Sequence, residues 1–282
     1  MSMTALVSAF ARAYHAGREG AKIYEDRYAR ALLSDQEYAQ IAAQMTAGVS
    51  FFAPGFQGEA DAALRRVMDG FLSPTPLARA AFAAEELAES GARQLLLLAG
   101  GYDAAGYDSG LPVFELDRPD VLADKQARLR RAGIPIQHVH FVPADLSCPD
   151  WPEGLLAAGF DTAKPTFCTM MGLCYYLSKE ETGQLLSALS SLLAVGSRIA
   201  LDTPIASQAI QGTLAAGAGE PMKAVYDRSA LETMAAHSGL RLRHYLTPQD
   251  MQARFFDPYN SKTPEHPMYA PGDTALCLLE KA

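Results

Sequence analysis

Glycines and an aspartate follow an apolar run near the middle of the chain, in an arrangement that could hold a ligand. Gly100 and Gly101 come directly after residues 94–99, and Asp103 lies two positions further on. Glycines allow the backbone to approach a ligand closely, and a helix that begins after such a loop attracts negative charge. Because Gly106 falls at the wrong spacing for GxGxxG, the pair by itself predicts either a ligand-binding loop or a tight turn.

Asp117 ends the next apolar run, residues 113–117. A carboxylate at the end of a second strand can accept hydrogen bonds from both hydroxyls of a ribose, which is the usual acidic position in nucleotide-binding βαβ units. The alternative is a capping role for a helix that begins near Pro119, but Asp120 is available as a local cap. We therefore favour ribose binding for Asp117.

Asp145 and Leu146 follow a third apolar run, residues 139–142. An aspartate there can accept a hydrogen bond from the exocyclic amine of adenine while a leucine packs on the ring. A plain capping role for Asp145 agrees with the sequence equally well.

An apolar and aromatic turn, residues 171–177, follows a fourth apolar run at the position where a reacting group would lie. Met171, Tyr175 and Tyr176 are therefore the candidate catalytic residues. Neighbouring side chains cannot both face one site, so we expect one of the two tyrosines to pack in the core. Of the pair, we choose Tyr176 as the residue that matters for activity.

The elements that must position these residues alternate along the chain from residue 94 onward. Helical segments separate the apolar runs, among them residues 179–193, where Ser178 as N-cap and Glu181 predict a capping box. Such alternation predicts an α/β fold with a doubly wound, mostly parallel seven-stranded sheet, whose last two strands could pair antiparallel. Ligands bind outside the carboxyl ends of the strands in such a sheet. The predicted strands lie at residues 94–99, 113–117, 139–142, 165–171, 198–202, 240–246 and 275–279.

The pattern before residue 94 is helical. We expect residues 1–93 to form an N-terminal helical lid and substrate region, and residues 94–282 to form the α/β domain, the two making one compact unit. Thr75 is expected to cap a helix that has Pro76 at its first position. The Ala- and Gly-rich residues 214–219 are expected to be a mobile loop. The predicted helices lie near residues 5–14, 23–33, 38–45, 64–71 and 77–87.

Composition excludes several classes of protein. The 282 residues carry a net charge of −8 without a basic block, so neither nucleic acid nor an anionic membrane is an expected partner. The apolar runs are far shorter than the roughly 20 residues that span a bilayer, and the N-terminus is typical of a helix rather than a signal peptide. The four cysteines form no CxxC pair and lack histidines at zinc spacing, so we expect no metal site and reduced thiols in the cytoplasm. The oligomeric state stays open.

The order of these motifs resembles the leucine carboxyl methyltransferase-like family of class I S-adenosylmethionine (SAM)-dependent methyltransferases, which have a Rossmann-like fold. The resemblance covers about residues 20–205, and the segment PVFELDRPDVLADKQARL is its most telling part. It implies SAM as the cofactor and a small molecule as the partner substrate. The residues that it assigns to SAM are Arg79 for the carboxylate, Gly100, Gly101 and Asp103 for the glycine loop, Asp117 for the ribose, and Asp145 and Leu146 for the adenine.

The sequence departs from the family pattern at three places, and one of them is that the family's Tyr-Arg is Tyr107-Asp108 here. The Asp-Thr-Arg or Asp-Ser-Arg that follows the family's glycines is Asp103-Ala104-Ala105 here, and the Glu-Gly that follows strand four is Met171-Gly172. In the family, that glutamate lies close to the methionyl ammonium of SAM. The motifs expected to bind adenosine are still present, so these departures concern which reaction the protein carries out rather than whether it binds SAM.

Three functions agree with these residues. The one we favour is a methyltransferase acting on a carboxylate or hydroxyl of a small molecule in specialised metabolism; a carboxylate is ionised at pH 7 and needs no general base. The second is a SAM cyclase. An apolar Met171 favours the neutral form of the SAM amine, and this amine could attack the γ-carbon of the same molecule, expel methylthioadenosine and leave azetidine-2-carboxylate.

The third is a degenerate nucleotide-binding protein. The joint presence of the glycine loop, Asp117 and Asp145 argues against this alternative.

Overall fold

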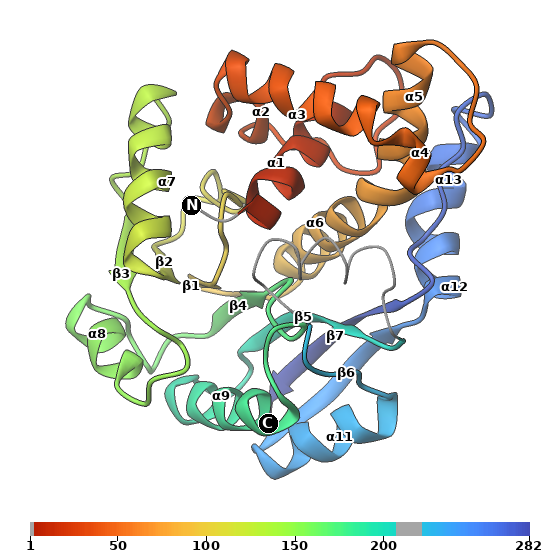
Figure 1. Cartoon of the computed structure of the whole chain (residues 1–282). Helices are drawn as coiled ribbons and strands as arrows, with labels where there is room; N and C mark the ends of the chain where they lie inside the picture. The colour runs from red at the N-terminus through yellow and green to blue at the C-terminus, as the bar shows by residue number, and fades with distance from the viewer. Residues whose placement is uncertain (1–2, 207–221) are drawn as a thin grey trace.

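A computed structural model describes residues 3–206 and 222–282, so the loop expected at residues 214–219 lies outside the described residues. The described strands form one seven-stranded sheet in the order β3-β2-β1-β4-β5-β7-β6 (Figure 1). Neighbouring strands from β3 to β5 pair in parallel, and β7 pairs antiparallel with both β5 and β6. The predicted doubly wound sheet is confirmed. The strands are β1 (Gln94–Leu98), β2 (Val113–Asp117), β3 (Val139–Pro143), β4 (Thr166–Met170), β5 (Arg198–Pro204), β6 (Leu240–Leu246) and β7 (Thr274–Lys281).

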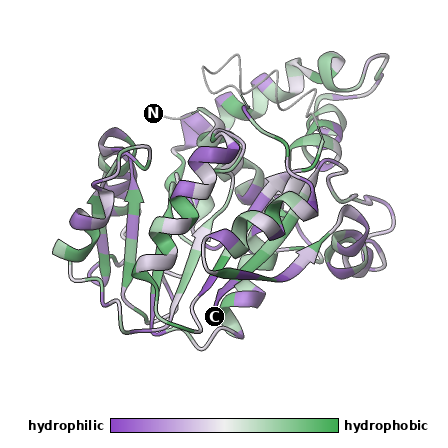
Figure 2. Cartoon of the chain, turned by 90° about the horizontal axis from the view of Figure 1, so that it is seen from below, coloured by the Kyte–Doolittle hydropathy of each residue, from purple (hydrophilic) through white to green (hydrophobic). Residues whose placement is uncertain are grey.

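Strand residues alternate between two hydrophobic clusters, one on each face of the sheet. Leu95 and Leu97 of β1 belong to the cluster that the N-terminal helices share. Leu96 and Leu98 belong to the cluster that includes residues of α8 (Trp151–Ala157), α9 (Lys179–Leu192) and α11 (Arg228–His237). Both faces of β1 are buried, which is why its sequence is a continuous apolar run rather than an alternating one. Figure 2 shows the hydrophobic residues concentrated along the central strands and on the helices that cover them.

Helices cover both faces of the sheet (Figure 1), and the face does not follow the order along the chain. Leu129, Phe256 and Tyr259 from later helices belong to the cluster of the N-terminal helices. The N-terminal ones are α1 (Met3–Ala16), α2 (Ala29–Leu32), α3 (Asp35–Ala47), α4 (Val49–Phe52), α5 (Ala60–Val67), the π-helix η1 (Met68–Leu72) and α6 (Pro74–Ala88). The later ones are α7 (Pro119–Arg131), α8 (Trp151–Ala157), α9 (Lys179–Leu192), α11 (Arg228–His237), α12 (Pro248–Met251), the π-helix η2 (Gln252–Phe256) and α13 (Asp257–Asn260). The capping box predicted for Ser178 and Glu181 is present at the start of α9.

The N-terminal region is fastened to the sheet by apolar packing and by ion pairs. Phe10 of α1 and Phe82 of α6 are fully buried in the same cluster as Leu95 and Leu97. Arg128 of α7 donates to Glu37 at the start of α3, with Nη2 to Oε1 at 2.7 Å. Side chains from residues before and after position 94 therefore share one core.

The structure corrects two of the predicted helices. The helix expected at residues 23–33 is reduced to the single turn α2, because the carboxylate of Asp26 accepts hydrogen bonds from the amides of Tyr28 and Ala29 and so starts the helix there. The cap expected at Thr75 is also wrong. The π-helix η1 runs directly into α6, which begins at Pro74 with Ser73 at its N-cap, so Thr75 lies inside the helix.

His15 is buried in α1 as a neutral ring. Burial is the main cause that lowers its pKa to about 3, and the positive charges of Lys22 and Arg18 lower it further. Its Nε2 accepts a hydrogen bond from the amide of Ile23 at 2.9 Å, which a protonated ring cannot do. Between pH 6.5 and about 3 the unfolded chain thus binds a proton at His15 that the folded chain does not, so stability falls as the pH drops through that window.

We expect the variant His15→Gln to lose less stability on acidification than the wild type. Between pH 7 and pH 4.5 the difference in the free energy of unfolding should reach about 2 kcal/mol, since each pH unit below pH 6.5 costs up to about 1.4 kcal/mol. Urea unfolding followed by circular dichroism measures it. The range stops at pH 4.5 because hydrogen bonds from Arg128 lower the pKa of Glu37 to about 2, and the stability that this group contributes is lost at more acidic pH. Equal losses in the two proteins would contradict the role given to His15.

Candidate functional site

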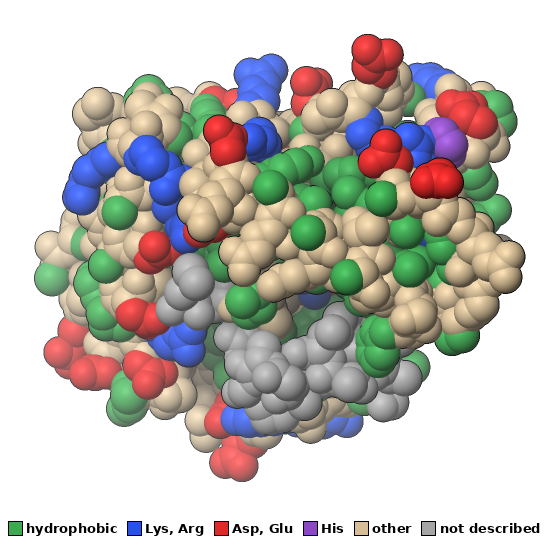
Figure 3. All heavy atoms as spheres, turned by 45° about the horizontal axis from the view of Figure 1, so that its top comes forward, with side chains coloured by type: hydrophobic (Ala, Val, Ile, Leu, Met, Phe, Trp, Pro, Cys, Tyr) green, Lys and Arg blue, Asp and Glu red, His purple; other side chains and the backbone are tan. Residues whose placement is uncertain are grey.

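A cavity of about 440 Å³ lies at the carboxyl ends of β1 to β4, where the strand order reverses. A crevice at this switch point is the expected ligand site of an open α/β sheet. On the face of the molecule shown in Figure 3, basic and acidic side chains are interspersed. The cavity wall includes nine of the ten residues singled out from the sequence, namely Arg79, Gly100, Gly101, Asp103, Asp117, Asp145, Leu146, Met171 and Tyr176.

The loop after β1 is pressed against helix α1. Ala99 and Gly101 have φ angles of 50° and 54°, in the left-handed region that favours glycine. A Cβ atom on Gly101 would lie 2.9 Å from the Cβ of Ala5, so only glycine fits between the loop and α1. Arg12 of α1 also donates to the carbonyl oxygen of Tyr102 at 3.0 Å. The helix therefore forms one wall of the cavity.

Asp117 is held in place by two backbone amides. Its Oδ2 accepts from the amide of Gly101 at 3.0 Å, and its Oδ1 accepts from the amide of Arg118 at 2.8 Å. The N-cap of α7 is Arg118 rather than Asp117, so the capping alternative does not hold. A carboxylate has about four lone-pair positions, and these amides use two of them. Asp117 can therefore accept further hydrogen bonds from a ligand in the cavity.

Asp145 and Leu146 lie side by side on the wall beyond β3. The Oδ1 atom of Asp145 accepts from both the amide and the hydroxyl of Ser147, at 2.9 and 2.6 Å. These hydrogen bonds lower the pKa of Asp145, which keeps it an acceptor at neutral pH. Leu146 supplies an apolar surface next to that acceptor.

The two tyrosines of the turn after β4 have different environments. Tyr176 lies on the cavity wall together with Met171. Tyr175 packs in the core, with 2% of its surface exposed and its hydroxyl 3.0 Å from Oγ1 of Thr274. Burial raises the pKa of Tyr175 above its usual value. The placement agrees with the expectation that only one of the pair can face the site.

Arg79 reaches the cavity from α6 and is anchored by Asp202 of β5. The Nε of Arg79 donates to Oδ2 of Asp202 at 2.5 Å. The other carboxylate oxygen of Asp202 accepts from the amide of Gly172 at 2.6 Å. Asp202 was not singled out from the sequence, although it lies near the end of an apolar strand as Asp117 does.

A buried ion pair lies beneath the glycine loop. The side chains of Lys125 and Glu115 are fully buried, with Nζ and Oε1 2.5 Å apart. Lys125 also donates to the carbonyl oxygen of Asp103, and Tyr107 donates to the other carboxylate oxygen of Glu115. Burial raises the pKa of Glu115, against the lowering effect of Lys125. The pair ties α7 and β2 to the loop that forms the cavity floor.

The sequence matches the family described as leucine carboxyl methyltransferase over residues 5–190. The chain belongs to this family. It is 34% identical to YktD of Bacillus subtilis strain 168, whose name assigns it to the SAM-dependent methyltransferases, over 90% of this chain and 91% of that protein. By class the protein is thus a SAM-dependent methyltransferase.

Solved structures support the same fold for this leucine carboxyl methyltransferase family member. A DUF574 family protein from Streptomyces avermitilis superposes with a TM-score of 0.60 and 17% identity, covering 98% of this chain and 97% of the other. A protein from Thermobifida fusca described as a methyltransferase superposes with a TM-score of 0.56 and 16% identity, covering 99% and 94%. At these identities, the likeness concerns the fold.

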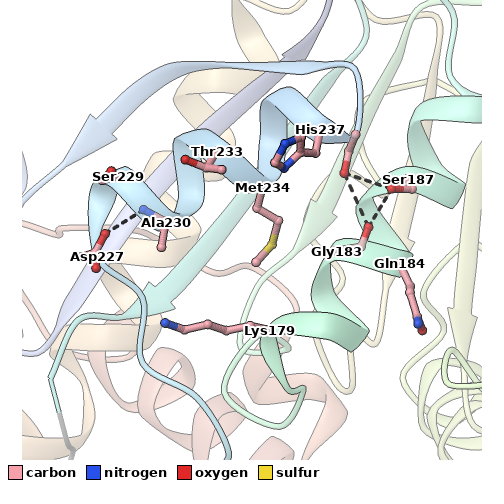
Figure 4. Close-up of a pocket in the computed structure, with 11 residues that line it drawn as sticks. Lys179, Gly183, Gln184, Ser187, Asp227, Ser229, Ala230, Thr233, Met234 and His237 are labelled. Carbon is pink, nitrogen blue, oxygen red and sulfur yellow. Dashed lines mark hydrogen bonds between the residues drawn. The ribbon is translucent and has the colours of Figure 1, made fainter.

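A second hollow, of about 930 Å³, lies between α9 and α11 on the outer helical layer (Figure 4). Two of its hydroxyls are turned to each other: the Oγ atoms of Ser187 and Ser238 lie 3.1 Å apart, and Ser187 donates to the carbonyl oxygen of Gly183 at 2.9 Å. The loops at the strand ends line the cavity at the switch point and not this hollow.

Among the cavity-wall residues that the sequence did not single out, four come from α1: Thr4, Ala5, Ser8 and Arg12. Their helical pattern indicated an amphipathic helix but carried no sign of which element it would meet. Within residues 3–206 and 222–282, no cluster of three or more His, Cys, Asp and Glu side chains could hold a metal ion. Over the same residues, no helix is long and apolar enough to cross a membrane.

Proposed function

We propose that this family member transfers the methyl group of SAM to a carboxylate or hydroxyl oxygen of a small molecule in specialised metabolism. The observation that carries the proposal is the convergence of Arg79, Asp117 and Asp145 on one cavity at the switch point. Their chemistry matches three parts of SAM: a guanidinium for the carboxylate, one carboxylate for the ribose hydroxyls and another for the adenine amine. Gly100 and Gly101 leave room for the ligand beside the backbone.

The chain's own contribution to the reaction is binding and alignment. SAM supplies an activated methyl group when it is bound, so the protein has chiefly to orient the acceptor and exclude water. A carboxylate acceptor is ionised at neutral pH and needs no general base. This agrees with the turn after β4, which presents mostly apolar residues to the cavity: Met171, Gly172, Leu173, Tyr176 and Leu177.

Residues 1–93 fit the role of lid and acceptor-binding region. Helix α1 lines the cavity through Thr4, Ser8 and Arg12. The side chain of Arg12 is nearly buried and is paired with Asp26 at 2.7 Å. The hydroxyls of Thr4 and Ser8 are the other polar side-chain groups that α1 contributes to the cavity wall.

The structure also bears on the compartment. The cysteines are free thiols, as in a protein of the reducing cytoplasm: Cys148, Cys168, Cys174 and Cys277.

Cyclisation of SAM is the second candidate, and the apolar side chain of Met171 on the cavity wall favours it. An apolar neighbour stabilises the neutral amine over the ammonium. In this reaction the amine nitrogen forms a bond to the γ-carbon, the bond from that carbon to sulfur breaks, methylthioadenosine leaves, and the amine proton passes to solvent. Tyr176 could hold the sulfonium by a cation–π contact.

Incubation with SAM alone separates the two reactions. We expect the purified protein to leave SAM almost unchanged and to form S-adenosylhomocysteine only when small carboxylic acids or phenols are added as a mixture. Mass spectrometry of the products measures both. Methylthioadenosine above the uncatalysed background, accompanied by a four-membered amino acid, would instead show the cyclase. The variant Met171→Glu then serves as the control, because a carboxylate next to the amine should suppress cyclisation but leave transfer to a separate acceptor.

A further inference from the structure

Asp202 is a fully buried carboxylate with a donor on each of its oxygens. Oδ2 accepts from Nε of Arg79 and Oδ1 accepts from the amide of Gly172. These donors come from α6 and from the turn after β4, whereas Asp202 itself belongs to β5. One side chain therefore joins three elements that meet at the reactive end of the cavity.

Arg79 is restrained from several sides at once. Its guanidinium carbon lies 5.1 Å from the centre of the Tyr175 ring. Gly172 has a φ of 75°, and a Cβ atom there would lie 3.0 Å from Nη1 of Arg79. With Nε bound to Asp202, Nη1 and Nη2 are the groups beside Gly172, which itself lines the cavity. The terminal edge of the guanidinium is thus the part that a ligand can meet.

We propose that Asp202 is the positioning residue of Arg79: it orients the guanidinium so that its terminal edge binds the carboxylate of the cofactor's amino-acid part. This inference rests on the proposed role of Arg79. Asp202 lies behind Arg79 and acts only through it, because Arg79 lines the cavity while Asp202 is fully buried. The buried pair keeps the guanidinium from rotating about its side-chain torsions, and so lowers the entropy lost when a carboxylate binds.

Asparagine is the informative replacement at position 202. Its side chain has nearly the same shape, but only one of its two terminal atoms accepts hydrogen bonds and the other donates. It can therefore satisfy Arg79 or Gly172, but it cannot satisfy both. Asp202→Asn should leave the fold in place and release either the guanidinium or the turn.

The test compares two ligands that differ in the amino-acid part. S-adenosylhomocysteine carries the carboxylate, and methylthioadenosine keeps the adenosine and lacks it. Titration calorimetry should show that Asp202→Asn weakens binding of S-adenosylhomocysteine about tenfold, as expected for one hydrogen bond to a charged group, while binding of methylthioadenosine changes less than about twofold. If Asp202 acts only through Arg79, adding Asp202→Asn to the variant Arg79→Ala should not change the ratio of the affinities for S-adenosylhomocysteine and methylthioadenosine any further.

Glu86→Gln is the matched control, because Glu86 is a buried carboxylate on the same helix as Arg79, with Oε1 3.5 Å from Nη2 of Arg254 and 3.0 Å from Nδ1 of His244. It should leave the ratio of the two affinities unchanged. Equal weakening of both ligands by Asp202→Asn, or an unchanged affinity for S-adenosylhomocysteine, would overturn the proposal. The role of Arg79 is tested separately: if Arg79→Ala alone fails to shift the ratio, then Arg79 does not bind the carboxylate, and the positioning role falls with it.

Discussion

Replacing Lys125 with methionine should lower the free energy of unfolding by about 3–5 kcal/mol, the usual cost of leaving one partner of a buried ion pair alone. Lys125 and Glu115 are both fully buried, and their charged atoms lie 2.5 Å apart. Without the ammonium, the Glu115 carboxylate keeps the hydrogen bond from the Tyr107 hydroxyl but has lost its ion-pair partner. It must then take up a proton, and the carbonyl oxygen of Asp103 loses a donor as well.

Urea unfolding at pH 7 measures the loss. The matched control is the double variant in which Glu115→Leu is combined with Lys125→Met, because replacing both partners by apolar residues of similar size is much less costly than removing one. We expect it to recover part of the stability. A loss below about 1 kcal/mol in Lys125→Met would mean that the pair contributes little, as exposed pairs do.

Asp117→Ala should weaken the binding of S-adenosylhomocysteine by about 1.5–3 kcal/mol, the range for hydrogen bonds to a charged group. Asp117 is nearly buried at the cavity and also accepts from the amide of Gly101. Its removal therefore takes away the proposed ribose acceptor and one restraint on the glycine loop. Both losses act in the same direction on affinity.

Titration calorimetry measures the change, and Asp120→Ala is the control. Asp120 is an exposed acid in the first turn of α7 and does not itself line the cavity, so its replacement changes the net charge equally without removing a side chain from the cavity wall. We expect its affinity to match that of the wild type. A folded Asp117→Ala protein with unchanged affinity would remove Asp117 from the proposed site.

The sheet was predictable from local sequence because each of its strands carries its own signal. The residues of β1 are buried throughout, and Leu95 to Leu98 form a continuous apolar run that stands out against the helical stretches. The predicted helix at residues 23–33 fails for a complementary reason. Asp26 is paired with Arg12 of α1, and such a contact between distant residues overrides local helix propensity.

By itself the sequence determined which residues end the strands, and therefore most of the cavity wall. Parallel strands all point their carboxyl ends to one edge of a sheet, so the order of Gly101, Asp117 and Asp145 along the chain is enough to bring them together. Only the tertiary structure decided the rest of the wall. The amphipathic pattern of α1 shows that one side is apolar but not which loop it will contact, and the Asp202–Arg79 pair joins residues 123 positions apart. Such contacts depend on how the layers pack, and packing between distant segments leaves no periodic signal in the sequence.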